Sequence, residues 1–471
     1  MAAQASDLSP RLTAAPRLGL LEALGVWLRE HQRALRRVQW LVIAIYAALL
    51  IVPALAPEPA RGAHIWNDVV LFAQFAFWGV WWPFVLVSMV LMGRTWCGVF
   101  CPEGALTEMV SEHGLGRAIP RWMKWKGWPF AGFVALTIYG QMISVYQYPK
   151  PVLVILGGST LGAMAVGYLY GRNKRVWCRY LCPVNGVFGL LAKLAPVHYA
   201  VDRAAWERWP RSAKTPALNC APLVAVRTMQ SASACHMCGR CAGFKDAVAL
   251  QPRPFNHEVV EVAGQESRPW ETALIVFGLL GVAPGAFLWA SSPWFVVVKQ
   301  RLAEWFVAHD MVWLLEPRLP WWILTNYPAN NDVLSTLDGG LLVAYILATA
   351  AVLGAAILAC LGLGARALGG STVARVHHLA QSLIPIAACG VFLGLSATTL
   401  AQLRADGLSL AFVAPLRVAL LAGSSLWSLN LAWSIAGRYA RSLPGQAAAT
   451  AGVGAAVAVS VMNWVLMFWI W

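Results

Sequence analysis

Cysteines are the residues of this chain whose type and spacing could do chemistry. A pattern of Trp-Cys, three further residues and Cys-Pro occurs at 96–102 and again at 177–183. Two thiolates four residues apart can face one point, and the proline ends one element and can open another. The two copies together offer four thiolates, the number that one [4Fe–4S] cluster requires. The first predicted ligand set is Cys97, Cys101, Cys178 and Cys182.

The doubled Cys-Pro also bears on which metal these thiols would bind. Zinc ribbons use two to four residues between cysteines, so the spacing alone admits zinc. However, Cys-x3-Cys-Pro closes the ferredoxin run that holds iron–sulfur clusters. The repeated Cys-Pro therefore favours iron–sulfur over a structural zinc site.

A third motif, Cys235-x2-Cys238-x2-Cys241, matches the core of the ferredoxin run. Lys245-Asp246 stands where that run would continue with Cys-Pro, so a fourth ligand must come from elsewhere. Cys220 is the nearest free thiol, and we predict a second cluster held by Cys220 and the three cysteines of the motif. The chain would then carry one or two [4Fe–4S] clusters.

Two other ligand sets remain open for this motif. In two-cluster ferredoxins the fourth cysteine ligates the other cluster, so Cys101 or Cys182 could cross over and leave Cys220 spare. Alternatively, Asp246 or His236 could complete a site with three cysteines. A c-type haem is excluded because the chain has no Cys-x2-Cys-His.

The composition indicates the elements that must position these thiols. Of the 471 residues, 59% are apolar and only 12% are charged, against about 25% charged in soluble domains. This predicts an all-α polytopic membrane protein, because lipid leaves no partner for an open backbone. Nine apolar runs are long enough to span, at 38–56, 69–92, 127–148, 151–170, 271–290, 339–365, 376–403, 418–437 and 446–469.

The positive charge sorts to one side of these nine spans. Most of the 36 Lys and Arg residues fall in the segments that share a side with the basic N-terminal region. The positive-inside rule makes this the cytoplasmic side. The net charge of +15 is then a topology signal that faces anionic lipid, and no nucleic-acid partner is expected.

The same sorting places eight cysteines on the cytoplasmic side and leaves Cys360 and Cys389 within spans, where we interpret them as small core residues. Disulfides belong to oxidising compartments, so eight thiols on the reducing side favour metal ligation. The localisation predicted is the bacterial inner membrane, with the N-terminus and cluster loops cytoplasmic and the C-terminus periplasmic.

We divide the chain into four parts. Residues 1–68 form a cytoplasmic segment and a first anchor. Residues 69–195 hold the duplicated span with its Cys-x3-Cys-Pro unit, at 69–116 and 151–195. Residues 196–270 form a cytoplasmic ferredoxin-like loop. Residues 271–471 form a five-helix membrane domain with a periplasmic loop at 291–338.

These motifs resemble the membrane polyferredoxins of the NapH, NosR and CcoG type, over about 69–255. The resemblance implies a cytoplasmic-membrane electron carrier with [4Fe–4S] clusters on its cytoplasmic face, and it carries over to the eight cysteines. The overall layout is similar to the FtrD-like polyferredoxin of ferrous iron uptake systems. That resemblance implies a cupredoxin or a periplasmic metal-binding protein as partner.

Three histidines are further candidates for metal or cofactor contact. His377 and His378 open the seventh span, where a haem, quinone or metal contact is one interpretation and ordinary hydration at the boundary is the other. His309, in the periplasmic loop, is a candidate beside Asp310 for a metal or a docking partner. The alternative there is a pair of interfacial helices, because Trp favours the membrane interface.

The sequence thus predicts an electron carrier, rather than a stand-alone enzyme, between a cytoplasmic donor and a membrane or periplasmic acceptor. One alternative is a copper or iron reductase, or an assembly factor for a respiratory oxidase or reductase. A second is a permease with structural metal sites. The near-absence of charge within the spans weighs against the permease.

Overall fold

The chain folds into a helical bundle with two short pairs of antiparallel strands. The structure is a computed structural model that describes residues 19–60, 62–210, 217–266 and 268–471. Almost every described element is a helix, which confirms the predicted all-α polytopic class. The first 18 residues of the predicted N-terminal segment lie outside the described residues.

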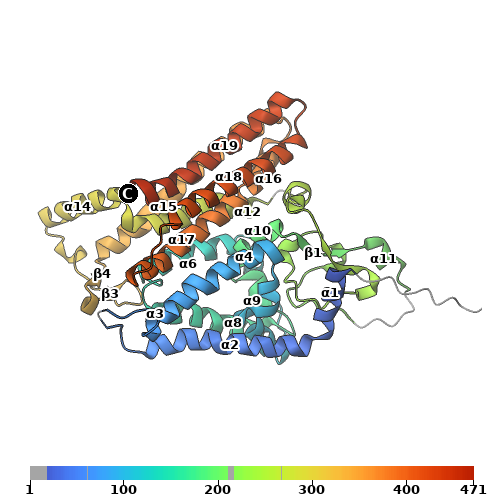
Figure 1. The fold of residues 1–471 in the computed structure, drawn as a ribbon, viewed down its shortest axis with the longest axis horizontal. Coiled ribbons are helices and arrows are strands. Elements are labelled where there is room, and N and C mark those ends of the chain that lie inside the picture. The colour runs from blue at the N-terminus through green and yellow to red at the C-terminus, as the bar shows by residue number, and fades with distance from the viewer. Residues whose placement is uncertain (1–18, 61, 211–216, 267) are drawn as a thin grey trace, which may run out of the picture.

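Eight helices in the described part of the chain are long and apolar enough to cross a membrane. Five are single helices: α2 (Gln32–Leu55), α15 (Thr336–Ala367), α17 (Ile384–Ala405), α18 (Val413–Gly437) and α19 (Leu443–Val465, continuing to Ile470). Three are built from joined pieces: α3 (Val69–Gln74) with α4 (Trp82–Met92), α7 (Pro149–Val152) with α8 (Gly158–Tyr170), and α12 (Pro269–Ala273) with α13 (Ala283–Leu288). Figure 1 shows them running between two ends of the molecule.

The remaining predicted span, 127–148, contains a shorter helix, α6 (Trp128–Met142). Its 15 residues cover only about 22 Å, less than the ~30 Å of a bilayer core. It nevertheless extends along the whole α12–α13 span. Trp125 contacts Trp270 at one end, and Trp289 donates a hydrogen bond to Gln141 at the other. The ninth predicted span therefore corresponds to a short helix that packs along a neighbouring span, and it is not among the eight helices long and apolar enough to cross a membrane.

The predicted span 376–403 is not one helix. The chain forms α16 (Thr372–Gln381), breaks at Ser382–Leu383 and restarts as α17 with Pro385 near its N-terminus. Proline has no backbone N–H and cannot continue a helix, so it favours a new start there. Only α17 is long and apolar enough to span.

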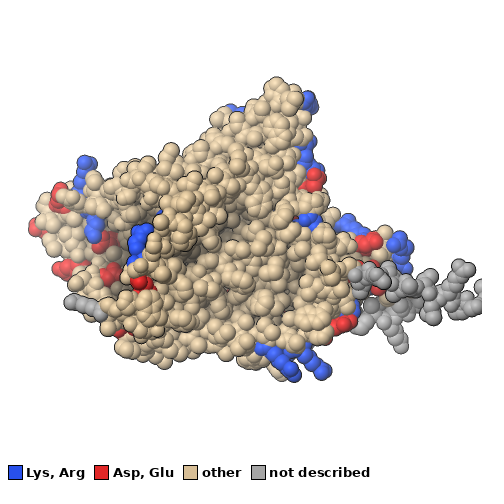
Figure 2. All heavy atoms as spheres, viewed as in Figure 1, with Lys and Arg blue, Asp and Glu red and all other residues tan. Residues whose placement is uncertain are grey.

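The charged residues lie at the two ends of the bundle. Figure 2 shows a wide surface almost free of Lys, Arg, Asp and Glu between a charged end near α14 and a charged end near α1 and α11. A helix surface that is apolar all round suits lipid. The shorter helices are α1 (Leu20–Glu30), α5 (Pro102–Glu112), α9 (Val176–Tyr180), α10 (Asn185–Leu191), α11 (Arg203–Arg208) and α14 (Pro293–Ala308). Figure 1 shows α14 at one end of the molecule and α1 and α11 at the other.

Two pairs of antiparallel strands lie at opposite ends of the molecule. Strands β1 (Val197–Val201) and β2 (Val248–Pro252) pair with Tyr199 opposite Leu250, and they close the loop that holds the third cysteine motif. At the other end, β3 (Asn326–Tyr327) pairs with β4 (Asp332–Val333). Within the predicted periplasmic loop 291–338 there is one long helix, α14, rather than the predicted pair.

Candidate metal centre

The first Cys-x3-Cys-Pro unit forms a tight turn between two helices. After α4, Gly93 adopts a positive φ of 59°, a conformation that costs glycine little. The chain then makes a π-helical turn over Trp96–Phe100. Cys101 caps α5, because its Sγ accepts a hydrogen bond from the Gly104 backbone N–H at 3.4 Å. Pro102 occupies the first position of α5, where no N–H is needed.

The second unit has the same order with a different local shape. Gly171 ends α8, Cys178 lies on the short helix α9, and Cys182-Pro183 precedes α10. The two units are also tied to each other. The Trp177 indole N–H donates to the Glu103 carboxylate, with 3.3 Å between Nε1 and Oε2.

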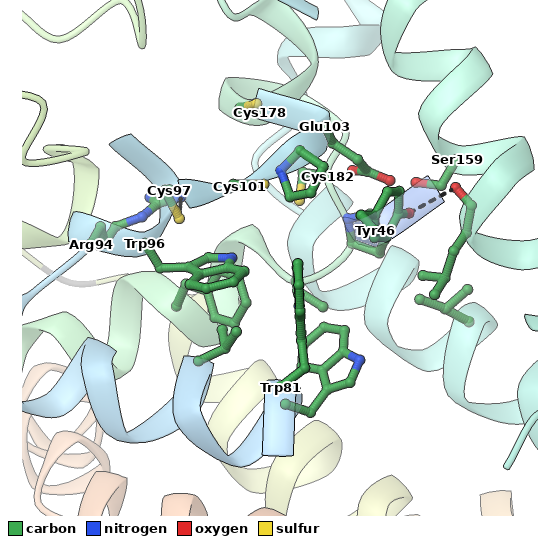
Figure 3. Close-up of a pocket in the computed structure, with 18 of the residues that line it drawn as sticks. Tyr46, Trp81, Arg94, Trp96, Cys97, Cys101, Glu103, Ser159, Cys178 and Cys182 are labelled. Atoms are coloured by element: carbon green, nitrogen blue, oxygen red, sulfur yellow. Dashed lines mark hydrogen bonds between the residues drawn. The ribbon is translucent and has the colours of Figure 1, made fainter. Parts of the chain in front are cut away.

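The two units bring their thiols to one cavity, as Figure 3 shows. Cys97, Cys101, Cys178 and Cys182 all line a cavity of about 100 Å³. Aromatic rings that include Trp81 close it on the membrane side. The internal repeat therefore places four cysteines from two distant segments around one space.

These thiols are costly to ionise without a metal. Burial raises the pKa of Cys178 to about 12, since a thiolate loses its hydration there. Burial, and then the neighbouring Cys97 and Cys178, raise the pKa of Cys101 well above its ordinary value. Burial likewise raises the pKa of Cys182. A bound cation would reverse this balance, because metals bind thiolates.

The remaining four cysteines outside the spans form a second group. Burial raises the pKa of Cys241, and the charges of Cys235, Cys238 and Cys220 raise it further. Burial also raises the pKa of Cys235 to about 12. Cys220, Cys235 and Cys241 pack against one apolar cluster that includes Tyr199 and Met237.

The residues fit an iron–sulfur cluster by their donors. Among the described residues, no three His, Cys, Asp or Glu side chains are close enough to hold a metal ion, so the thiols share a cavity without meeting at one point. Three buried polar atoms of residues that line this cavity, Nδ1 of His236, Nε of Arg94 and Nε1 of Trp82, have no hydrogen-bond partner in the described part of the chain. Such donors suit the sulfur acceptors of a cluster.

Two arginines, Arg175 and Arg240, lie beside the first set, and they share the buried carboxylate of Glu108. Arg175 is 2% exposed; it donates to the Glu108 carboxylate at 2.7 Å and to the backbone carbonyls of Cys97 and Gly98. Arg240 pairs with the other oxygen of Glu108. The two arginines hold the pKa of Glu108 below its usual value although burial opposes this. Positive charge beside a cluster favours its electron-rich form.

The N-terminal helices cover both cysteine loops, which the sequence analysis missed. Gln32 donates to the carbonyl of Cys238 at 3.1 Å, and Gln39 donates to the carbonyl of Gly98 at 3.3 Å. Arg29 donates to the carbonyl of Ala242 at 2.7 Å. The only signal for this is the seven-residue interval between the two glutamines, which places them on one face of α2.

The candidate histidines lie away from the thiols. Both ring nitrogens of His378 have partners: Nδ1 with the Tyr439 hydroxyl at 2.6 Å, and Nε2 with the Val259 carbonyl at 2.9 Å. His377 Nδ1 lies 2.8 Å from the Thr272 hydroxyl. These contacts favour a structural role for both. His309 is exposed, stacked on Trp305 and hydrogen-bonded to its carbonyl.

A helical membrane protein with eight cysteines in the loops at one end is the class that the fold and the site define. A family model described as a 4Fe-4S binding domain matches residues 74–125 and 154–199, the two stretches that carry the Cys-x3-Cys-Pro units. The resemblance to membrane polyferredoxins predicted from the sequence is thereby confirmed.

Three curated proteins illustrate this similarity. YccM of Escherichia coli (strain K12), named as an electron transport protein, is 26% identical over 243 residues, which is 44% of this chain and 65% of YccM. The regulatory protein NosR of Pseudomonas aeruginosa is 26% identical over 34% of this chain and 25% of NosR. The methylamine utilization ferredoxin-type protein MauN of Paracoccus denitrificans is 27% identical over 40% of this chain and 75% of MauN. No solved structure is significantly similar.

Proposed function

We propose that this chain is an integral membrane electron carrier with two [4Fe–4S] clusters, one for each group of four cysteines. The observation that carries the proposal is the meeting of Cys97, Cys101, Cys178 and Cys182 at one cavity beside the membrane-spanning helices. Bound clusters would supply one-electron chemistry. The protein would exclude water and adjust the reduction potentials through burial, charge and hydrogen bonds.

For the second cluster we propose Cys220, Cys235, Cys238 and Cys241. The electrostatic interaction among these thiols supports this set. The alternatives have less support: Cys101 and Cys182 line the other cavity, and Asp246 is exposed. His236 also lines that other cavity, which favours Cys220 over His236 as the fourth ligand of the motif.

The burial of the two sets suggests a direction for the electrons. Two cysteines of the first set, Cys97 and Cys178, are buried and its other two are partly exposed, whereas all four cysteines of the second set are partly exposed. We propose that a soluble cytoplasmic donor meets the second set and that electrons leave from the first set toward a membrane or periplasmic acceptor. This requires the end with α1 and α11 to be cytoplasmic and the protein to lie in the inner membrane.

The other predicted roles have less support. A permease would need ionisable groups along its spans, and the ion pair of the buried Lys193 with Glu271 lies at the beginning of the Pro269–Ser291 span. A metal reductase or an oxidase assembly factor would use the same clusters, so it differs only in its acceptor. Ferrous iron uptake and a cupredoxin partner stay predictions.

The proposal is tested by purifying the protein without oxygen. Iron and acid-labile sulfide are counted, and absorbance and EPR spectra are recorded before and after dithionite. We expect roughly eight iron and eight sulfide per chain, as two [4Fe–4S] clusters require, and paramagnetic signals after reduction. A colourless protein that contains zinc would contradict the proposal.

The ligand set is tested by Cys220→Ser, with Cys360→Ser as the matched control because Cys360 lies within a span. Cys220→Ser should lose about half the iron or shift the EPR signal of one cluster. The control should keep the full iron content and the wild-type spectrum. An unchanged Cys220→Ser protein would mean that the fourth ligand lies elsewhere.

A further inference from the structure

The two cysteine groups are separated by a single layer of chain. Gly98 lies between Cys97 and Cys101, and a Cβ atom on it would stand 1.9 Å from the backbone oxygen of His236 and 3.0 Å from the backbone nitrogen of Cys238. Only glycine permits this approach. The first cysteine turn is therefore pressed directly against the loop that carries the third motif.

His236 crosses this layer. By sequence it belongs to the third motif, between Cys235 and Cys238, yet its side chain lines the cavity of Cys97, Cys101, Cys178 and Cys182. Its side chain is almost completely buried, with 2% exposed. Nδ1 of its ring is buried and has no hydrogen-bond partner among the described residues.

Two other donors at this cavity, Nε of Arg94 and Nε1 of Trp82, are also buried without a partner among the described residues, whereas the remaining arginine N–H groups here are engaged. Arg94 donates to the Ser233 carbonyl at 2.8 Å and to Asn185 Oδ1 at 2.7 Å, and its NH2 approaches Cys97 Sγ at 3.7 Å. Arg175 is held by Glu108 and by backbone carbonyls. A buried donor without a partner is costly, so the unused capacity of His236 points to an acceptor that occupies the cavity.

We propose that His236 donates a hydrogen bond from Nδ1 to a sulfur atom of the cluster held by the first cysteine set, and that it thereby raises the reduction potential of that cluster. This inference rests on the proposed function. Hydrogen bonds to cluster sulfurs stabilise the electron-rich form. The first cluster then depends on the second site, because the loop that holds the second cluster also carries the side chain that tunes the first.

The experiment is an EPR-monitored redox titration of the full chain, purified without oxygen, with iron and sulfide counted in each sample. His236→Leu removes the donor, and His236→Gln retains one on a flexible side chain. His257→Leu is the matched control, since His257 is an exposed histidine of the same cytoplasmic region.

With His236→Leu, the potential of the first-set cluster should fall, so that its oxidised-to-reduced ratio at a fixed potential rises roughly tenfold. His236→Gln should lie between His236→Leu and the wild type, and His257→Leu should match the wild type. The potential of the second-set cluster should change less than that of the first. Cys220→Ser should also shift the first-set cluster, because it loosens the loop that holds His236.

Two results would overturn the inference. One is an unchanged first-set potential in His236→Leu with full iron content. The other is loss of iron in both His236 variants, which would make His236 a ligand or a structural residue. Absence of clusters from the wild type would instead overturn the proposed function, and the iron count separates that failure from the other two.

Discussion

At the residue scale, the cysteine loops depend on small residues as much as on thiols. The thiols resist ionisation because they are buried together, so metal binding must compensate for that cost. The loops reach this burial only by close backbone approach. Gly98, Gly167 and Gly171 each stand where an added Cβ would meet a neighbouring backbone oxygen.

Gly98→Ala should separate the two cysteine loops. The new methyl group would stand 1.9 Å from the His236 oxygen, so one loop must shift. We expect lower iron content at both sites and a destabilisation of roughly 1–3 kcal/mol, typical of overpacking. Gly158→Ala is the control, since no atom lies within 4 Å of its added Cβ. Equal iron content in the two variants would show that the loops do not need this contact.

The four thiols of the first set could be predicted from the sequence because the repeat encodes them. The same Trp, Cys and Pro recur after an apolar span, so two copies must present thiols at equivalent depths. The direction of the His236 ring could not be predicted in this way. It depends on how the 196–270 loop packs against Gly98, and no local pattern encodes a contact between segments more than a hundred residues apart.

At the element scale, the C-terminal helices are joined to the cluster region by a layer of buried polar groups. Glu258 is fully buried and pairs with Arg253; it also accepts from the Ala232 backbone N–H at 2.8 Å. Ala232 lies just before the third cysteine motif. His378 ties α16 to the Val259 carbonyl in the adjoining turn. The membrane domain therefore helps to position the loop of the second cluster.

The pH dependence of the free energy of unfolding should reveal the contribution of the hydrogen-bonded His378. Burial lowers the pKa of His378 to about 4, and Arg438, Arg375 and Lys193 act in the same direction. The pKa of a histidine in the unfolded chain is about 6.5. The unfolded chain therefore binds the proton more tightly, so this stabilisation is complete above about pH 6.5 and is lost as pH falls toward 4.

Between pH 6.5 and 5, the wild type should lose about 2 kcal/mol through this group. His378→Gln should lack that component, so its thermal unfolding in detergent should depend less on pH. His257→Gln, at an exposed position, serves as the control and should follow the wild type. Parallel pH curves for His378→Gln and the wild type would contradict the buried neutral histidine.

Hydropathy could not predict where the helices begin and end. The run 127–148 looked like a full span, but the helix ends at Met142 and Ser144 adopts a φ of 54°. Apolar residues continue beyond the helix because they pack against the outer end of the bundle: Ile143 is completely buried, and the Met142 carbonyl accepts from Thr325. Hydropathy is high both for residues buried in protein and for residues that face lipid, so it could not locate the end of this helix.

At the scale of the whole molecule, the number of crossings decides whether the two Cys-x3-Cys-Pro units can lie on the same side of the membrane. The first repeat and the second are separated by α6 and the α7–α8 helix. If α6 did not cross, residues 102–126 and 171–268 would face opposite sides. The shared cavity of Cys97, Cys101, Cys178 and Cys182 requires that they face the same side. The charge-free band in Figure 2 agrees with that arrangement.

The topology is tested with an epitope tag inserted into the full chain at one of three exposed positions, after Gly116, after Glu266 or after Asn331 in the β3–β4 turn, or added at the C-terminus. Antibody is added to intact spheroplasts and to permeabilised ones, and iron content confirms that each tagged protein is assembled. Because nine crossings put the β3–β4 turn and the C-terminus outside, those two tags should react in intact spheroplasts. The tags after Gly116 and Glu266 should react only after permeabilisation, since both would lie with the cysteine loops in the cytoplasm.

If the Gly116 and Glu266 tags react on opposite sides, α6 does not cross, and the two Cys-x3-Cys-Pro units cannot serve one cluster. If all four tags show the reverse sidedness, the crossings stand, but the electron donor must be sought outside the cytoplasm.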